Sequence, residues 1–185
     1  MKSYIFKMVL SILIISSLII VYKEKNSSEL IGEYVIINNI MYRSEYNSYD
    51  EPAIYEGLTL KELGTKIDKV FNSTLEGYGA TVASIALESE VDPIIAASII
   101  LVETGCKWSC SSLVKNSNNV GGMRGKNGYM KFDTLEEGLQ AFINNLAKNY
   151  YAKGLDTPEL MNKKYATNPN WYKDVYYYID LIKAS

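Results

Sequence analysis

Residues 92–105 read DPIIAASIILVETG, and this stretch decides the fold because only the interior of a domain can accommodate it. Asp92 can cap a helix, Pro93 suits the first helical position, and Gly105 supplies a left-handed stop. Aliphatic residues on every side leave no face that could rest against water. The pattern therefore predicts a buried central helix on which the rest of the domain packs.

Glu103 is the exception in this apolar helix. At helical spacing it lies beside Ile99 and Ile100, which partly desolvates the carboxylate, and the C-terminal end of the helix dipole further disfavours its negative charge. Both effects raise the pKa of Glu103. A carboxylic acid that stays protonated near neutral pH can protonate a leaving-group oxygen, as glycosidic bond cleavage requires. The alternative is a glutamate that reaches the surface and pairs with Lys107 or Arg124.

Composition narrows the possible chemistry. The chain has 185 residues, 48% of them hydrophobic, which corresponds to about one domain after an N-terminal segment. Beyond residue 22 there are 17 basic against 21 acidic residues, a net charge of −4 that argues against a nucleic acid partner. The sequence has no histidine and two cysteines, which excludes Ser-His-Asp and Cys-His nucleophiles and a structural zinc site. We expect no metal and no cofactor, and carboxylate chemistry of the kind that cleaves glycosides.

The N-terminal segment, residues 1–22, is expected to direct export. Lys2 and Lys7 precede a charge-free apolar run at residues 8–22. Fifteen helical residues span about 22 Å, less than the roughly 30 Å of a bilayer core, as in a signal peptide. No small-x-small cleavage site or lipobox cysteine follows, which favours an uncleaved membrane anchor. The remainder is then expected outside the cytoplasm, anchored to the membrane or secreted.

Residues 23–58 are rich in Tyr, Asn, Ser and Glu, and we interpret them as a tether with at most a marginal strand at residues 34–37. Apolar spacing predicts helices over residues 60–75, capped by Thr59, and over residues 80–90. Residues 59–185 are therefore expected to form the folded domain.

Two cysteines, Cys106 and Cys110, follow the central helix. In an exported protein they could form a disulfide that stiffens the segment beside Glu103, and two free buried thiols are the alternative. Further along, four glycines between Gly121 and Gly128 would let a ligand approach the backbone closely. A plain turn is the alternative for this loop.

The C-terminal third alternates short and long elements. Residues 129–132 have the pattern of a strand, one arm of a small hairpin, and Thr134 begins a capping box for a helix that stops near Gly154. Cap-and-proline pairs at residues 157–158 and 168–169 predict two more helices. Aromatic residues crowd the last of them and are typical of core and surface packing, although some could line a saccharide cleft.

These motifs together resemble the glucosaminidase domains of glycoside hydrolase family 73, in the lysozyme-like superfamily. The resemblance covers residues 78–183 in order. It rests on Asp92-Pro93, Glu103-Thr104-Gly105, the run NNVGGMRG at 118–125, the run FDTLEEG at 132–138, and Tyr165-Ala166-Thr167 with Trp171 and Val175.

The resemblance implies a mainly helical, two-lobed domain with a short β-hairpin and a groove for peptidoglycan. It implies that Glu103 is the general acid, that Tyr165 stands near the scissile bond, and that the glycine loop lines the groove. With Asp133 as the candidate second acid, the catalytic set is Glu103, Tyr165 and Asp133. The expected substrate-binding residues are Thr104, Asn119, Gly121, Gly122, Met123, Arg124, Tyr129, Phe132 and Trp171.

Two departures from the family pattern bear on the mechanism. Thr104 replaces the usual serine, and nothing acidic lies between Gly105 and Phe132, where many members carry a second acid. Without a protein nucleophile, the substrate's 2-acetamido group could attack the anomeric carbon, or the muramic 6-hydroxyl could attack and leave an anhydro product. The sequence therefore predicts a monomeric peptidoglycan glycosidase of the endo-β-N-acetylglucosaminidase type. A lytic transglycosylase and a membrane-anchored cell-wall-binding module with weak catalysis are the alternatives.

Overall fold

The computed structural model describes residues 34–37, 40–43 and 52–185. The chain divides into two compact units, Met1–Tyr49 and Asp50–Ser185, and each is described by itself. The apolar run at residues 8–22, expected to be an export signal or anchor, lies outside the described residues. Within the described part, no helix has the length and apolar character needed to cross a membrane.

The first unit contains a β-hairpin. Strand β1 (Tyr34–Ile37) pairs antiparallel with β2 (Ile40–Arg43), with Tyr34 opposite Arg43. The strand expected at residues 34–37 is confirmed, whereas its partner was not foreseen from the sequence.

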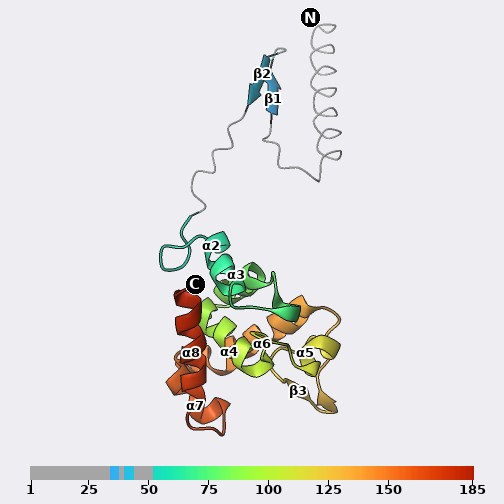
Figure 1. The fold of residues 1–185 in the computed structure, drawn as a ribbon, viewed down its shortest axis with the longest axis vertical. Coiled ribbons are helices and arrows are strands. Elements are labelled where there is room, and N and C mark those ends of the chain that lie inside the picture. Colours follow the sequence, from blue (N-terminus) through green and yellow to red (C-terminus); the bar gives the residue numbers. More distant parts are fainter. Residues whose placement is uncertain (1–33, 38–39, 44–51) are drawn as a thin grey trace, which may run out of the picture. The chain divides into compact units, whose positions relative to one another are not determined.

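The second unit is mainly helical, with one short antiparallel hairpin (Figure 1). This confirms the predicted helical class with a small β element. Its described elements are α2 (Leu60–Asp68), η1 (Ser73–Leu75), α3 (Gly79–Glu88), α4 (Pro93–Thr104), α5 (Ser112–Ser117), β3 (Arg124–Gly125), β4 (Gly128–Tyr129), α6 (Leu135–Asn149), η2 (Tyr151–Lys153), α7 (Pro158–Tyr165) and α8 (Trp171–Lys183).

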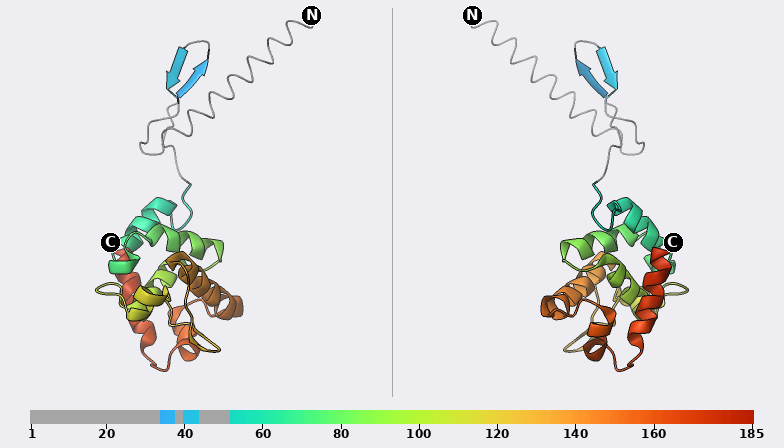
Figure 2. Two further views of the ribbon diagram at one scale, coloured as in Figure 1. Left: turned by 90° about the vertical axis from the view of Figure 1, so that its right-hand side faces the viewer. Right: turned by 90° about the vertical axis from the view of Figure 1, so that its left-hand side faces the viewer.

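Helix α4 is the buried centre that the sequence predicts. The Asp92 carboxylate accepts a hydrogen bond from Ile95 N at 2.8 Å, Pro93 occupies the first turn, and Gly105 ends the helix with φ 67°. Nine of its twelve residues are buried. Helix α8 lies along it, as the views in Figures 1 and 2 agree, and α3 also packs against it.

The segment before α2 belongs to the packed unit, although the sequence places it in the tether. Tyr55 and Leu58 pack against the core, and the Tyr55 hydroxyl donates to Asp92 Oδ2 at 2.8 Å. The same carboxylate therefore caps α4 and holds the chain that leads into the domain.

Helix α2 ends at Asp68, so the single helix expected over residues 60–75 is wrong. Asn72 N donates to Cys106 O at 2.8 Å instead of to a carbonyl of its own helix. Asn72 has an extended backbone, and its side chain caps the short 3-10 turn η1. A contact with a distant segment therefore splits what the local pattern presents as continuous.

Helix α8 starts at Trp171, not at the Asn168-Pro169 pair. The buried side chain of Asn162 in α7 donates to Asn168 O at 2.8 Å and accepts from Tyr172 N at 3.1 Å. These bonds hold residues 168–170 in a turn and supply the cap from outside the helix. The cap-and-proline start of α7 at Thr157-Pro158 is confirmed.

Two smaller differences concern α5 and α6. The six-residue helix α5 was not foreseen, since it is too short for a periodic pattern. The helix expected to reach Gly154 is interrupted at Tyr150, whose ψ is −67° at φ −124°, and continues as η2. Gly154 supplies the left-handed stop with φ 71°.

Two glycines allow α2 and α3 to pack closely. A Cβ on Gly64 would lie 2.7 Å from the Ala80 Cα, and one on Gly79 would lie 2.2 Å from Gly64 O. Both contacts are with backbone, which cannot turn aside as a side chain can.

We expect Gly64→Ala to lower the free energy of unfolding by about 1–3 kcal/mol, because overpacking outweighs the roughly 1 kcal/mol gained in helix propensity. Urea unfolding followed by circular dichroism measures the change. Lys61→Ala, on the exposed side of the same helix, is the control and should stay within about 0.5 kcal/mol of the wild type. A Gly64→Ala protein as stable as the control would contradict the close contact.

Candidate active site

A pocket of about 620 Å³ opens at the C-terminal end of α4, and Glu103 lies in its wall. Burial of α4 places this carboxylate at a fixed point, because the apolar turns below it are held on all sides. The residues that line the pocket with Glu103 come from the glycine loop and hairpin, from α6, and from the end of α7.

Aromatic rings form the α7 side of the pocket. Tyr165 stacks on Trp171, with ring centroids 4.4 Å apart and planes inclined by 21°. The ring centroid of Tyr150 lies 5.4 Å from that of Tyr165. Tyr165 and Tyr150 line the pocket, whereas Trp171 is only 5% exposed and supports Tyr165 from behind. The predicted site residues Glu103, Tyr165 and Trp171 are therefore brought together, with Trp171 as packing support.

The environment of Glu103 favours its protonated form. Glu103 is an exposed residue, yet the groups packed around its carboxyl desolvate it in part, and this desolvation raises the pKa of Glu103 above its ordinary value. Hydrogen-bonding contributions from Trp171 and Tyr165 offset part of this rise. The sequence-based expectation of a raised pKa is confirmed.

The sequence left open the alternative that Glu103 pairs with Lys107 or Arg124 at the surface, and the contacts of Glu103 differ from it. Within residues 52–185 no ion pair joins Glu103 to Lys107 or Arg124. The buried indole N–H of Trp171 has no hydrogen-bond partner of standard geometry, although it lies near enough to influence the Glu103 carboxylate. It is therefore available to stabilise negative charge when Glu103 loses its proton.

Tyr165 remains a proton donor at any physiological pH. Burial raises the pKa of its hydroxyl well above the ordinary value, and the nearby Glu103 charge raises it further. A neutral phenol near a carboxylate can donate a hydrogen bond to it, and Tyr165 thereby adds to the lowering effect that Trp171 has on the pKa of Glu103.

The glycine loop is held by one buried side chain, Asn119. Its amide nitrogen donates to Met123 O and Met130 O, both at 2.9 Å, and its amide oxygen accepts from Met123 N at 2.8 Å. Asn119 is 1% exposed and does not line the pocket. It holds the loop and the hairpin in place. Its predicted direct contact with substrate stays a prediction.

Gly121 brings the loop against α6. A Cβ at this position would lie 2.1 Å from Phe142 Cδ2, so only glycine permits this approach. Gly121, Met123 and Arg124 line the pocket, as expected, whereas Gly122 does not, and its φ of 59° shows that it serves the turn.

Arg124 lies at the edge of the pocket on the hairpin. It pairs across the strands with Tyr129, so both side chains share one face, and its guanidinium carbon lies 4.7 Å from the Tyr129 ring centroid. Strand β4 covers Gly128–Tyr129 only, shorter than the strand expected over residues 129–132. Among the pocket residues that the structure describes, Arg124 is the only cation.

Four other expected site residues do not line this pocket: Thr104, Tyr129, Phe132 and Asp133. Thr104 is buried, and its hydroxyl donates to Ile100 O and accepts from Cys106 N, which ties the end of α4 to the next turn. Phe132 N instead donates to Ser117 O at the end of α5, at 3.1 Å, and Asp133 N donates to Glu137 Oε2 in the first turn of α6, at 3.0 Å. A catalytic role for Asp133 stays a prediction.

Other pocket residues were missed in the sequence. Four come from α6 and the residue after it: Ala141, Phe142, Asn145 and Tyr150. Met130 and Ala166 add to the lining. Ala141 and Asn145 are one turn apart and interrupt the large apolar residues of α6, which is the only local signal of a face turned toward a cavity.

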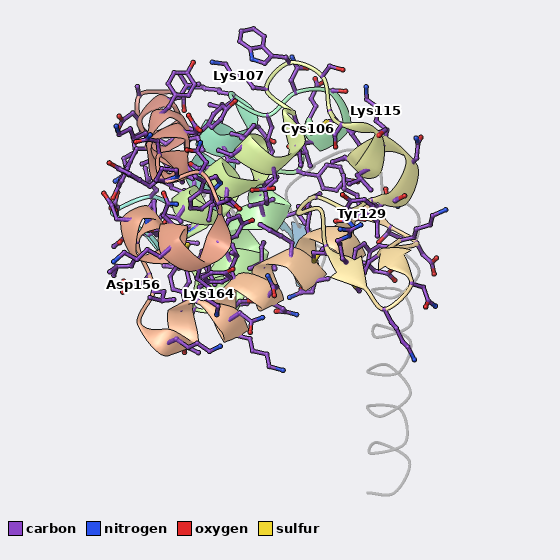
Figure 3. The ribbon with its side chains drawn as sticks, turned by 90° about the horizontal axis from the view of Figure 1, so that it is seen from below. Cys106, Lys107, Lys115, Tyr129, Asp156 and Lys164 are labelled. Atoms are coloured by element: carbon purple, nitrogen blue, oxygen red, sulfur yellow. A yellow bond between two sulfur atoms is a disulfide. The ribbon has the colours of Figure 1, made fainter. Side chains whose placement is uncertain are left out.

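A disulfide joins Cys106 and Cys110, with their Cα atoms 4.2 Å apart. The sequence left open a disulfide or two free buried thiols, and the structure has the disulfide. Figure 3 shows Cys106 beside Lys107 at the edge of the domain. The closed loop begins three residues after Glu103 and is anchored by the bond from Asn72 N to Cys106 O.

Comparison with protein families agrees with this geometry. The family model described as mannosyl-glycoprotein endo-beta-N-acetylglucosaminidase matches residues 79–184, more than half of the chain. The chain belongs to the glucosaminidase family. This confirms the resemblance to glycoside hydrolase family 73 and makes the protein a glycoside hydrolase. Among curated proteins none matches the sequence.

We expect Tyr165→Phe to raise the pKa of Glu103 further, because it removes the hydroxyl that can donate to the charged form of Glu103 while it keeps the stacked ring. A ¹³C NMR titration of labelled glutamate side chains, assigned with Glu103→Gln, measures the shift. Tyr150→Phe is the matched control, because Tyr150 makes no hydrogen-bonding contribution to Glu103. A lower or unchanged pKa in Tyr165→Phe would show that the phenol does not contact the carboxylate.

Proposed function

We propose that this glucosaminidase cleaves the glycan strands of peptidoglycan, as an endo-β-N-acetylglucosaminidase with Glu103 as general acid. The observation that carries the proposal is that Glu103, whose pKa is raised, lines a pocket of about 620 Å³. The helical class and the hairpin support a lysozyme-like, two-lobed arrangement around this pocket.

Glu103 supplies the proton for bond cleavage. The protonated carboxyl donates to the glycosidic oxygen as the bond to the anomeric carbon breaks, and the leaving sugar departs as a neutral alcohol. The proton is present below the pKa of Glu103 and is lost as the pH rises through it. Desolvation therefore extends the active range toward neutral pH. Tyr165 and Trp171 stabilise the carboxylate that results.

The positive charge at the anomeric carbon needs a nucleophile. A protein carboxylate would lie about 5–5.5 Å from the acid in a retaining enzyme and about 6.5–9.5 Å in an inverting one. In the part of the chain that the structure describes, Glu103 is the only acidic residue lining the pocket. The oxygen of the substrate's own 2-acetamido group therefore attacks and forms a cyclic oxazolinium ion. Water then opens this ring, assisted by Glu103 as base, and restores the acetamido group.

The rest of the pocket suits an amino sugar that carries acidic substituents. Tyr165 and Tyr150 offer flat apolar surfaces, Met123 and Met130 offer adaptable ones, and Asn145 offers amide hydrogen bonds. Arg124 complements carboxylate groups, which peptidoglycan has and neutral glycans lack. This charge favours peptidoglycan over a neutral chitin-like polymer.

The location of the enzyme follows from its substrate. Peptidoglycan lies outside the cytoplasm, and the apolar run at residues 8–22 would export the chain and hold it at the membrane surface. The disulfide between Cys106 and Cys110 is compatible with an oxidising compartment. We propose a monomer that acts in the cell envelope.

We expect Glu103→Gln to lower the rate of peptidoglycan clearance by about 10²–10⁴-fold, because the amide cannot donate the proton. Turbidity loss and the appearance of reducing ends measure it. The variant should keep its stability or gain some at neutral pH, since ionisation of a desolvated carboxylate disfavours the fold above its ordinary pKa. Clearance equal to the wild type would remove Glu103 from its role.

Asp133→Asn is the matched control for this experiment. Both changes replace one exposed acidic group by its amide, but Glu103 lines the pocket and Asp133 does not. We expect it to keep activity within a few-fold of the wild type. A loss as large as that of Glu103→Gln would identify Asp133 as the second catalytic carboxylate and contradict the 2-acetamido route.

The lack of a second carboxylate in the described pocket also favours one alternative, a lytic transglycosylase, in which the muramic 6-hydroxyl attacks. Mass spectrometry of the products separates the two reactions. We expect saturating digestion to give reducing-end N-acetylglucosamine, because water opens the oxazolinium ion. Products that end in 1,6-anhydromuramic acid would assign the transglycosylase reaction instead.

A further inference from the structure

Two exposed aromatic side chains lie close to one lysine, away from the catalytic pocket. Trp108 is 75% exposed and Tyr177 is 54% exposed, whereas the other tryptophan, Trp171, is 5% exposed. Figure 3 shows Lys107 well separated from Tyr129 of the hairpin and from Lys164 of α7. None of Lys107, Trp108 and Tyr177 lines the catalytic pocket. We call these three residues the aromatic platform.

The platform is carried by rigid segments. Trp108 is in the loop closed by the Cys106–Cys110 disulfide, and both cysteines are buried. Trp108 N donates to Gly105 O at 3.0 Å, and Asn72 N holds Cys106 O. Tyr177 comes from the middle of α8. A side chain this exposed gains little from burial on folding, so its fixed presentation points to contact with a ligand.

Lys107 orients the two rings. Its Nζ lies 5.0 Å from the centroid of each ring and donates to the Tyr177 hydroxyl at 2.9 Å. Two further N–H donors of the ammonium group remain. Across residues 52–185 no carboxylate forms an ion pair with Lys107. The platform therefore combines aromatic faces with a positive charge that is open to an anionic group.

A hollow of about 390 Å³ adjoins Lys107. Lys69 adds a second positive charge to its wall, Asn72 adds an amide, and Val70, Phe71 and Leu181 add apolar surface. Its volume falls within the range of small-molecule and sugar sites, about 300–1,000 Å³. Lys107 belongs to both the hollow and the platform, whereas Trp108 and Tyr177 do not line the hollow. The exposed rings and the adjoining hollow together offer the aromatic, apolar, amide and ammonium groups that match a sugar ring bearing a carboxylate.

We propose that Lys107, Trp108 and Tyr177 form a second glycan-binding surface, which stacks a sugar ring on its aromatic side chains and pairs Lys107 with a carboxylate of the polymer. This proposal rests on the proposed function only for the choice of peptidoglycan as that polymer. The role of the surface is to hold the enzyme on the insoluble wall, while the pocket at Glu103 cleaves the glycan strand.

The platform and the catalytic pocket share their supporting helices. Lys107 follows Glu103 by four residues, and Tyr177 lies about 9 Å along α8 from Trp171, at 1.5 Å per residue. One polymer can therefore occupy both surfaces, and binding at one raises the effective concentration at the other. A short soluble fragment that fills only the pocket gains nothing from the platform.

An aromatic and basic patch could also rest on an anionic lipid surface. The hollow beside Lys107 favours a discrete ligand such as a sugar, because a lipid surface is contacted by protruding side chains and not by a concave site. Vesicles are accordingly included as a separate arm of the test.

The test measures binding without cleavage. The full chain carrying Glu103→Gln, kept in mild detergent, is sedimented with insoluble peptidoglycan, and the bound fraction gives an apparent Kd. We expect Trp108→Ala and Tyr177→Ala each to weaken binding roughly three- to tenfold, in line with the loss of one aromatic contact. Leu160→Ala, which removes a similarly exposed apolar side chain from α7, is the control and should bind unchanged.

The charge is tested separately. We expect Lys107→Gln to weaken binding to native peptidoglycan and to have little effect once the carboxylates of the polymer have been amidated. In the active chain, Trp108→Ala should slow clearance of insoluble peptidoglycan but leave turnover of short soluble fragments unchanged. These two results distinguish loss of the platform from loss of the active site, because loss of the active site would abolish turnover of both insoluble peptidoglycan and short soluble fragments.

Two outcomes would overturn the proposal. One is unchanged sedimentation of Trp108→Ala, Tyr177→Ala and Lys107→Gln with peptidoglycan. The other is Trp108-dependent binding to vesicles of phosphatidylglycerol with no such dependence on peptidoglycan, which would assign the platform to the membrane. Circular dichroism and thermal unfolding confirm that each variant is folded, as expected for changes at exposed side chains.

Discussion

The structure depends on the burial of α4, a helix without a polar face. Its apolar turns can be shielded from water only if other helices surround them, and α3 and α8 do so along its length. The last turn carries Glu103, a group that cannot be fully buried at reasonable cost without a partner. The helix must therefore end at an opening. The same hydrophobic constraint that organises the core thus places a partly desolvated carboxyl at the mouth of a pocket.

Buried amides shape the parts of the site that have little regular structure. Asn119 holds the glycine loop and hairpin through three hydrogen bonds, and Asn162 holds the turn between α7 and α8 through two. Such side chains satisfy backbone groups that no helix or strand satisfies. They also set where Arg124 and Trp171 lie. The site is therefore built by polar contacts within a framework held by apolar ones.

A single pocket carboxylate is consistent with a glycosidase whose substrate supplies the nucleophile. The enzyme then needs an acid, hydrogen-bond donors for that acid once it is ionised, and surfaces that hold the sugar. In the proposed mechanism, Glu103 is the acid, Tyr165 and Trp171 are the donors, and the aromatic and methionine walls hold the sugar. The aromatic platform around Lys107, if it binds glycan as proposed, would add a contact outside the reaction itself, as an insoluble polymer requires.

The sequence by itself determined the features that depend on neighbouring residues: the central helix, the caps at Thr59, Asp92, Thr134 and Thr157, and the raised pKa of the Glu103 carboxyl. Local spacing and side-chain chemistry are sufficient for these. Only the tertiary structure decided where α2 ends and where α8 begins. It also decided that Tyr150 and Asn145 line the pocket, and that Trp171 supports Tyr165. Each of these results from contacts between residues far apart in the chain, and such contacts leave no periodic signal in the sequence.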